Sequence, residues 1–257
     1  MGKIFFCDAH FHAAQCAPWC RLPYAGCHFA GASCSHSKEE FCWQENCVHS
    51  WREQGILLPL FGIHPQQPDI ENASFMEQLL ADKRIVGVGE AGFDFFTAEY
   101  RSQRVGQESA WDISLSLAQK YGVPVVVHNR KALDLMFRDS KRLAGLPSVV
   151  FHSFAFGPRE AQSLLSHGIN AYFSFGKQIL NGNKKSIACV KNLPLERLLF
   201  ETDAPYQTLR GELVTKPEDL VKVYNEACSL RNLPAGELAE HIQKNFESVF
   251  RTRLGSF

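Results

Sequence analysis

Six side chains able to bind a metal ion follow short apolar segments of this sequence, each at or just past the end of its segment. They are His10, His12, Glu90, His128, His152 and Asp203. Imidazole and carboxylate groups are the ligands of borderline and hard divalent ions. Side chains alternate along a strand, so His10 and His12 point the same way. Any one of the six could instead be a core or turn residue, but the joint set predicts a metal site.

The apolar segments that carry these residues read as eight strands separated by helix-like stretches. They are Ile4–Cys7, Gly26–Ala32, Ile56–Phe61, Ile85–Val88, Val123–Val127, Val149–Phe151, Ile169–Phe173 and Leu198–Phe200. Continuous apolar runs are typical of strands buried on both faces, and strand–helix alternation indicates a parallel sheet. We expect a single (β/α)8 TIM barrel domain over residues 1–257, with a doubly wound open sheet as the alternative. In such a barrel the carboxyl ends of the strands carry the active site.

Several of the intervening stretches have the length or the periodicity of helices. Lys38–Gln54 and Ser102–Tyr121 are long enough, and an extra C-terminal helix is expected over Ala235–Phe250. Apolar residues three or four positions apart predict its buried face, which consists of Leu238, Ile242, Phe246 and Val249. Ala13–Ala25 contains two prolines and is expected to be a loop.

The composition excludes several classes of protein. The chain has 257 residues, and its 27 basic side chains balance 27 acidic ones. Hydrophobic residues make up 45% of the chain, which excludes a disordered protein, and no apolar run reaches the about 18 residues of a membrane span. The zero net charge also argues against a polycation that coats nucleic acid.

Seven of the nine cysteines fall within the first 47 residues. The count is odd, no Cys-x-x-Cys pair occurs, and the first residues lack an apolar segment of signal-peptide length. We therefore expect reduced thiols in a cytoplasmic protein. Cys7 and Cys27 are predicted to be core residues, whereas Cys16, Cys20 and Cys34 are predicted to reach the mouth of the active site.

The segment Gly87–Gly92 matches the G-x-G-x-x-G pattern of dinucleotide-binding proteins. That site needs a helix that opens at the last glycine to receive the pyrophosphate, and none is expected there. Glu90 would also repel phosphate. We therefore expect no nucleotide cofactor, and we expect the glycines to let a loop fold back around Glu90.

Seven short motifs, taken in order, resemble the TatD-related metal-dependent deoxyribonucleases, a branch of the amidohydrolase-like barrels. The matching segments are Asp8–His12, Gly62–Pro65, Gly87–Asp94, His128–Arg130, His152–Phe154, Glu201–Tyr206 and Asn245–Phe246. The resemblance implies a site for two divalent cations, Mg²⁺, Mn²⁺ or Zn²⁺. His10, His12 and Asp203 would hold the first ion, His128 and His152 the second, and Glu90 would bridge both.

The resemblance also suggests roles for further residues. Asp203 would act as the general base, and His64 would contact a phosphate or a metal-bound water. Arg130 and Arg210 are the candidate substrate contacts. Asp94 is expected to orient a ligand or the loop, and Glu201 to hold a water or a further ion, or to be structural.

The function that follows is a metal-dependent deoxyribonuclease, an exonuclease in which a water activated by two ions attacks a DNA phosphodiester. The expected substrate is single-stranded DNA or DNA ends, and the expected protein is a monomer without a membrane anchor. Activated hydroxide attacks carbonyl carbon and phosphorus alike, so the alternative is a hydrolase of a small amide, lactone or phosphoester. A non-catalytic metal-binding protein would lack a ligand, and none is missing.

Overall fold

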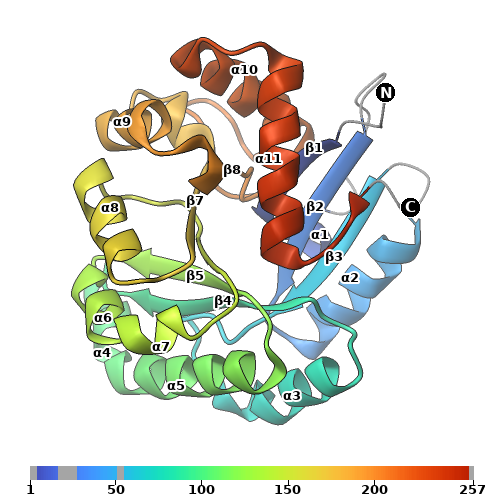
Figure 1. Ribbon diagram of the computed structural model, residues 1–257. Coiled ribbons are helices and arrows are strands. Elements are labelled where there is room, and N and C mark those ends of the chain that lie inside the picture. The colour runs from blue at the N-terminus through green and yellow to red at the C-terminus, as the bar shows by residue number, and fades with distance from the viewer. Residues whose placement is uncertain (1–4, 17–27, 51–54, 255–257) are drawn as a thin grey trace.

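The computed structural model describes residues 5–16, 28–50 and 55–254. Within them, eight parallel strands form one sheet in sequence order, and Figure 1 shows helices packed around it. The strands are β1 (Phe5–Phe11), β2 (His28–Ser35), β3 (Gly55–Phe61), β4 (Gly87–Asp94), β5 (Val125–Arg130), β6 (Val149–Phe151), β7 (Ala171–Phe175) and β8 (Leu198–Phe200). The predicted number and order of strands are confirmed.

The sheet closes into a barrel where the end of β8 meets β1. The main-chain N–H of Asp203 donates to the carbonyl of His10 at 3.0 Å. The buried carboxylate of Asp8 accepts hydrogen bonds from the main-chain N–H (3.0 Å) and the hydroxyl (2.6 Å) of Thr202. This closure confirms the TIM barrel and excludes the doubly wound open sheet.

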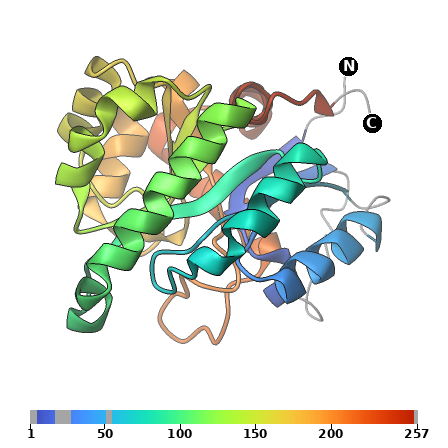
Figure 2. The same ribbon diagram turned by 90° about the horizontal axis from the view of Figure 1, so that it is seen from below.

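Helices follow the strands and cover the outside of the barrel. They are α1 (Ala13–Cys16), α2 (Lys38–Ser50), α3 (Ala73–Ala81), α4 (Ala98–Ser102), α5 (Arg104–Tyr121), α6 (Leu133–Arg138), α7 (Ser140–Ala144), α8 (Pro158–Ser166), α9 (Lys184–Asn192), α10 (Leu220–Arg231) and α11 (Ala235–Phe250). Four 3₁₀ turns join them: η1 (Ile70–Asn72), η2 (Lys177–Ile179), η3 (Leu195–Arg197) and η4 (Pro217–Asp219). Figure 2 shows α3 and α5 side by side on this outer layer.

The predicted helices agree with these bounds except at their ends. The helix predicted from Ser102 begins as α5 at Arg104, directly after the short α4. In α11 the predicted face of Leu238, Ile242, Phe246 and Val249 is buried. Ala13–Ala25, predicted as a loop, starts with the single turn of α1, and residues 17–25 lie outside the described residues, as do 51–54.

The barrel interior is apolar, and its polar residues gather at the carboxyl ends of the strands. Val125, Val126 and Val127 of β5 are fully buried, and His128 follows them directly. In the described part of the chain, no helix is both long and apolar enough to span a membrane. All cysteines of the described residues are free thiols, and Cys7 is buried in the core as predicted.

Candidate metal centre

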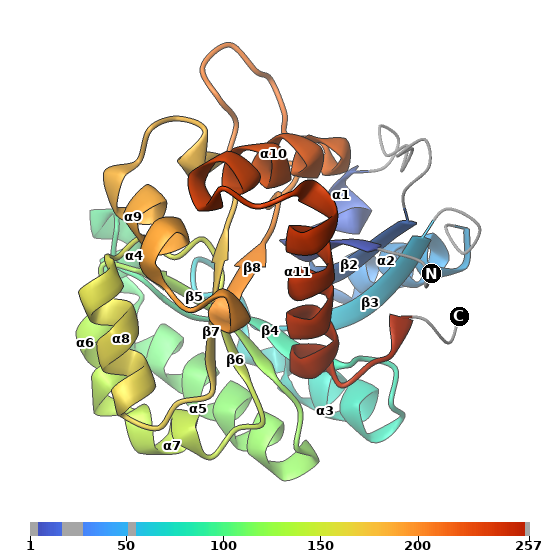
Figure 3. The same ribbon diagram turned by 45° about the horizontal axis from the view of Figure 1, so that its top comes forward.

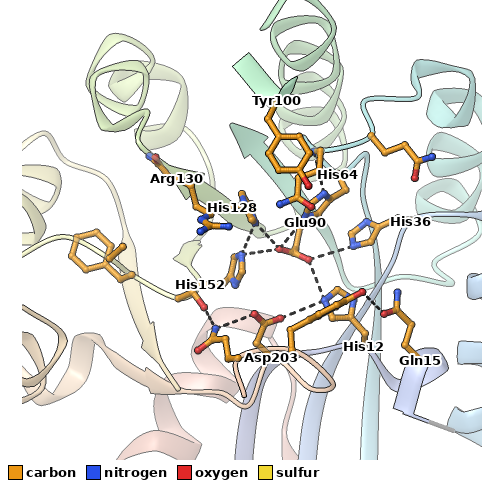
Figure 4. Close-up of a pocket in the computed structure, with 18 of the residues that line it drawn as sticks. His12, Gln15, His36, His64, Glu90, Tyr100, His128, Arg130, His152 and Asp203 are labelled. Carbon is orange, nitrogen blue, oxygen red and sulfur yellow. Dashed lines mark hydrogen bonds and ion pairs between the residues drawn. The ribbon is translucent and has the colours of Figure 1, made fainter. Parts of the chain in front are cut away.

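The carboxyl ends of the strands surround an open cavity of about 1330 Å³. Five of the six predicted ligands line it: His12, Glu90, His128, His152 and Asp203. Figure 4 shows these side chains converging on Glu90. His10 is fully buried and its Nε2 atom also faces Glu90, at 3.3 Å from Oε1. The strands therefore bring the whole predicted set together.

Glu90 reaches the cavity because β4 carries a bulge. Residues 87–94 form one continuous strand, and its pairing with β5 changes register between Gly89 and Ala91. A bulge turns the side chain that it carries. The predicted loop around Glu90 is therefore wrong, and the glycines serve close strand packing instead. A Cβ atom on Gly89, for example, would lie 2.7 Å from the Cβ atom of Val126.

One oxygen of Glu90 faces the residues predicted for the first ion. The Nε2 atom of His10 lies 3.3 Å from Oε1 of Glu90 and 3.4 Å from Oδ1 of Asp203. The Nε2 atom of His12 lies 3.3 and 3.5 Å from the same two oxygens. Asp203 follows β8, and Gln207 donates a hydrogen bond to its other oxygen at 2.9 Å.

The other oxygen of Glu90 faces the residues predicted for the second ion. Oε2 lies 2.7 Å from Nε2 of His152 and 3.2 Å from Nδ1 of His128. The opposite nitrogen of the His128 ring, Nε2, lies 3.1 Å from Oδ2 of Asp94. A carboxylate behind an imidazole ligand fixes its tautomer and its orientation. Asp94 thus orients His128.

Charge attraction within this cluster shifts the pKa of its groups. Burial alone would lower the pKa of His10 and His152, but the Glu90 carboxylate raises both, that of His152 to about 9. Burial would raise the pKa of Glu90 and Asp203, but the imidazoles lower both well below the usual range. Without metal, protonated imidazoles therefore neutralise the two carboxylates.

The arrangement of donor atoms fits metal ions. The buried Nε2 atom of His10 has no hydrogen-bond partner, which leaves it available as a ligand. Two ligands with bonds of about 2.0–2.1 Å to one tetrahedral ion lie about 3.3 Å apart. The Nε2 atoms of His10 and His12 lie 3.3 to 3.5 Å from Oε1 of Glu90 and Oδ1 of Asp203, which agrees with this ligand spacing.

Buried polar residues behind the ligands hold them in place. The Sγ atom of Cys34 lies 3.4 Å from Nδ1 of His10, so this thiol reaches the site from inside the barrel. Cys16 is buried and does not line the cavity, and Cys20 and Cys27 lie outside the described residues. Glu201 accepts two hydrogen bonds from Ser153, directly after His152, and so fixes that strand end.

The predicted substrate contacts fall in different places. His64 lines the cavity, with Nε2 at 3.7 Å from Glu90, and burial lowers its pKa to about 4. Arg130 lines the rim, where its guanidinium lies 4.1 Å above the Phe96 ring. Arg210 is exposed on the loop between β8 and α10, which projects beyond the barrel in Figure 3, and it does not line the cavity.

Sequence reasoning missed His36, which lines the cavity with Nε2 at 3.3 Å from Oε1 of Glu90. A signal was present, because His36 directly follows a strand end, as several of the predicted ligands do. It was overlooked because the strand was predicted to stop at Ala32, whereas β2 continues to Ser35. Gln66 and Gln207, which donate to Asp94 and Asp203, carried no comparable signal.

Comparison with known proteins identifies the family of this chain. A family model described as TatD related DNase matches residues 8–251. The chain belongs to the TatD-related DNase family. It is 32% identical over 203 residues to the 3'-5' ssDNA/RNA exonuclease TatD of Edwardsiella piscicida, covering 74% of this chain and 76% of that protein. It is 29% identical over 201 residues to the uncharacterized metal-dependent hydrolase YjjV of Escherichia coli K12, covering 76% of each.

A solved TatD homologue has the same fold. The crystal structure of YJJV from Escherichia coli K12 superposes with a TM-score of 0.80 and 26% sequence identity, over 96% of this chain and 98% of that one. The predicted family and fold are thus confirmed, and this TatD-related chain is a metal-dependent hydrolase. Its candidate ligand groups all contain residues that line the strand-end cavity, and His10 lies buried directly behind it.

Proposed function

We propose that this TatD-related hydrolase is an exonuclease that removes nucleotides from single-stranded DNA or DNA ends and uses two divalent ions. One observation carries the proposal. The two oxygens of Glu90 face separate sets of imidazoles, His10 and His12 on one side and His128 and His152 on the other. A carboxylate placed in this way is suited to bridge two ions, and paired ions suit phosphodiester hydrolysis.

The first ion would be held by His10, His12 and Asp203, and the second by His128 and His152. When bound, such ions act as Lewis acids and lower the pKa of water. The donor set is rich in nitrogen, which favours Zn²⁺ or Mn²⁺ over Mg²⁺.

Asp203 is the proposed general base, and His64 is the proposed hydrogen-bond donor to the substrate. The low pKa of Asp203 keeps it a carboxylate, which accepts a proton from the attacking water as the general base. In His64, Nδ1 accepts a hydrogen bond from the main-chain N–H of Gln66 at 3.2 Å. The proton of the neutral ring therefore sits on Nε2, which can donate to a phosphate oxygen or the leaving group.

The rim of the cavity suits a flexible single strand. Arg130 supplies a positive charge at the edge, and the half-exposed ring of Tyr206 offers a surface on which a base can stack. Arg210 on the projecting loop is the second proposed phosphate contact. With zero net charge, the chain must attract nucleic acid through these few groups and the ions.

Metal analysis combined with a nuclease assay tests this function. The wild-type protein should contain two ions and shorten a single-stranded oligonucleotide from one end. Glu90→Ala and Asp203→Ala should lose at least a hundredfold in rate. Full nuclease activity in both variants would rule out the mechanism. Hydrolysis of lactones or cyclic amides, with no action on DNA, would assign the site to the other class of hydrolase.

We also propose that the protein acts as a single-domain monomer in the cytoplasm. Its free thiols fit a reducing compartment. Size-exclusion chromatography at micromolar concentration tests the monomer, and a dimer peak would contradict it.

A further inference from the structure

His36 is an imidazole of the cavity that the two proposed ion positions do not use. It lies between the end of β2 and α2, and it belongs to none of the motifs that mark the family in this sequence. Its Nε2 atom is buried, has no hydrogen-bond partner, and lies 3.3 Å from Oε1 of Glu90. Figure 4 shows the ring on the opposite side of Glu90 from His152.

The other ring nitrogen fixes the tautomer of His36. Nδ1 lies 3.0 Å from the carbonyl oxygen of Gly62, which can only accept a hydrogen bond. Nδ1 therefore carries the proton, and the neutral ring presents a bare lone pair at Nε2. That lone pair faces a carboxylate oxygen at 3.3 Å, an arrangement that is repulsive unless a proton or a metal ion lies between the two atoms.

His64, the neighbouring ring, has the opposite arrangement. Its Nδ1 accepts a main-chain hydrogen bond, so its proton sits on Nε2 and it faces the cavity as a donor. His36 instead follows the usual pattern of a metal-binding histidine, in which one nitrogen donates to a carbonyl and the other binds the ion. The hydrogen bonds thus distinguish a ring suited to bind metal from one suited to bind substrate.

His36 shares one oxygen of Glu90 with the residues proposed for the first ion. Its Nε2 atom lies as far from Oε1 of Glu90 as those of His10 and His12, 3.3 Å in each case. The ligand atoms of His12, His36 and Glu90 all lie within 4.8 Å of one another.

The main chain around His36 is held in place by a short network. The main-chain N–H of His36 donates to the carboxylate of Glu40 at 2.8 Å, and Gln15 donates to the other oxygen of that carboxylate at 2.6 Å. The hydroxyl of Tyr206 in turn donates to Gln15 at 2.6 Å. This network fixes the main chain that carries the His36 ring at the edge of the cavity.

We propose that His36 binds the first ion through Nε2, together with His10, His12, Glu90 and Asp203. This inference rests on the proposed two-ion site and adds a third imidazole to one of its positions. A position with three imidazoles prefers Zn²⁺, Co²⁺ or Ni²⁺ to Mg²⁺ more strongly than one with two. With His36 as a ligand, the first position would also have fewer coordination sites open to water than the second position.

Cobalt binding tests the proposal without reference to activity. Co²⁺ is titrated into metal-free wild-type protein, His36→Gln and His36→Glu, with visible absorption reporting the ligand field and a chelator competition giving the affinity. We expect His36→Gln to bind the tighter ion at least tenfold more weakly and to change its spectrum, with two ions still bound. His36→Glu, which restores a ligand atom, should recover most of the affinity.

The control is His167→Gln, because His167 lies on the surface at the end of α8, away from the cavity. It should match the wild type, and circular dichroism should show that every variant is folded. A wild-type spectrum and affinity in His36→Gln would overturn the role of His36 while leaving the two-ion function intact. Loss of a separate third ion would also overturn it. A wild-type protein that binds no cobalt would instead refute the proposed function.

Discussion

Metal binding by this site should release protons, with His152 as the clearest source. The Oε2 atom of Glu90 lies 2.7 Å from Nε2 of His152 and raises the pKa of this buried ring to about 9. At neutral pH the metal-free ring is therefore protonated. Only the neutral ring can bind an ion, so each ion that enters must displace this proton.

The size of this pH effect on metal affinity follows from the shift in the pKa of His152. At pH 7 the ring lies about two units below its pKa, so the neutral form makes up about 1% of the population. The apparent affinity of the second ion should then rise about tenfold between pH 7 and pH 8, and about fiftyfold between pH 7 and pH 9, where about half of the rings are neutral. The fiftyfold change corresponds to about 2.3 kcal/mol.

The stability of the metal-free protein should change in the opposite direction. A pKa raised from 6.5 to about 9 in the folded state contributes stability that is fully present below pH 6.5. That contribution is lost as the pH rises toward 9. The difference in Tm between metal-loaded and metal-free protein should therefore widen with pH.

Isothermal titration calorimetry measures the released protons directly. Mn²⁺ is titrated into metal-free protein at pH 7 and pH 8 in two buffers of different ionisation enthalpy. We expect at least one proton per chain at pH 7, and about tenfold tighter binding at pH 8. His167→Gln should behave like the wild type. Equal affinity at both pH values without proton release would refute the reasoning, because it would mean that His152 is neutral before metal binds.

Four further predictions test other parts of the structure. Arg130→Ala should lower the slope of log affinity against log salt concentration by about 0.7 for a single-stranded oligonucleotide, and an unchanged slope would exclude its phosphate contact. Arg210→Ala tests the second arginine in the same assay. His64→Ala should lower kcat about a hundredfold with full metal content, whereas His64→Gln, which keeps an N–H donor, should retain most of it; loss of an ion would make His64 a ligand instead. Gly62→Ala would place a Cβ atom 2.5 Å from the Gly89 carbonyl carbon. The free energy of unfolding in urea should fall by about 1–3 kcal/mol, and the content of bound metal should fall with it. Wild-type stability would contradict this packing. Lys177→Met should cost about 3 kcal/mol in the free energy of unfolding, because it removes the buried ammonium group that pairs with Glu212 and Asp219 and leaves them only the exposed Lys222. Lys222→Met should cost less than about 1 kcal/mol, and equal costs would argue against the difference in burial.

The order of the strands was predictable because strands buried on both faces need continuous apolar sequence. Val149–Phe151 and Leu198–Phe200 were predicted with the bounds that the structure has. The strands β2 and β4 extend past their apolar segments because neighbouring strands supply hydrogen-bond partners for small and polar residues. That tertiary effect has no local pattern, so the glycine-rich stretch around Glu90 was predicted as a loop although it belongs to β4.

The convergence of the candidate ligands was predictable where a histidine or carboxylate directly follows an apolar run. His36 was missed because the end of its strand was placed three residues too early. Lys177 shows a different limit of prediction from sequence. Its place beside a strand end fits a phosphate contact, yet the side chain is buried and its ammonium group pairs with Glu212 and Asp219. The partners come from a loop far along the chain, and local sequence does not identify such pairs.

The seam of the barrel sets the order in which the site can form during synthesis. The strand-end groups proposed for the first ion include two from β1 and Asp203, and the main-chain hydrogen bond from Asp203 to His10 belongs to the seam itself. Glu90, His128 and His152 lie in the middle of the chain. A ribosome-bound chain of about 160 residues already contains the second half of the site, whereas the first half must wait for β8 to emerge and dock. Metal bound at the first position would therefore indicate that β8 has docked against β1.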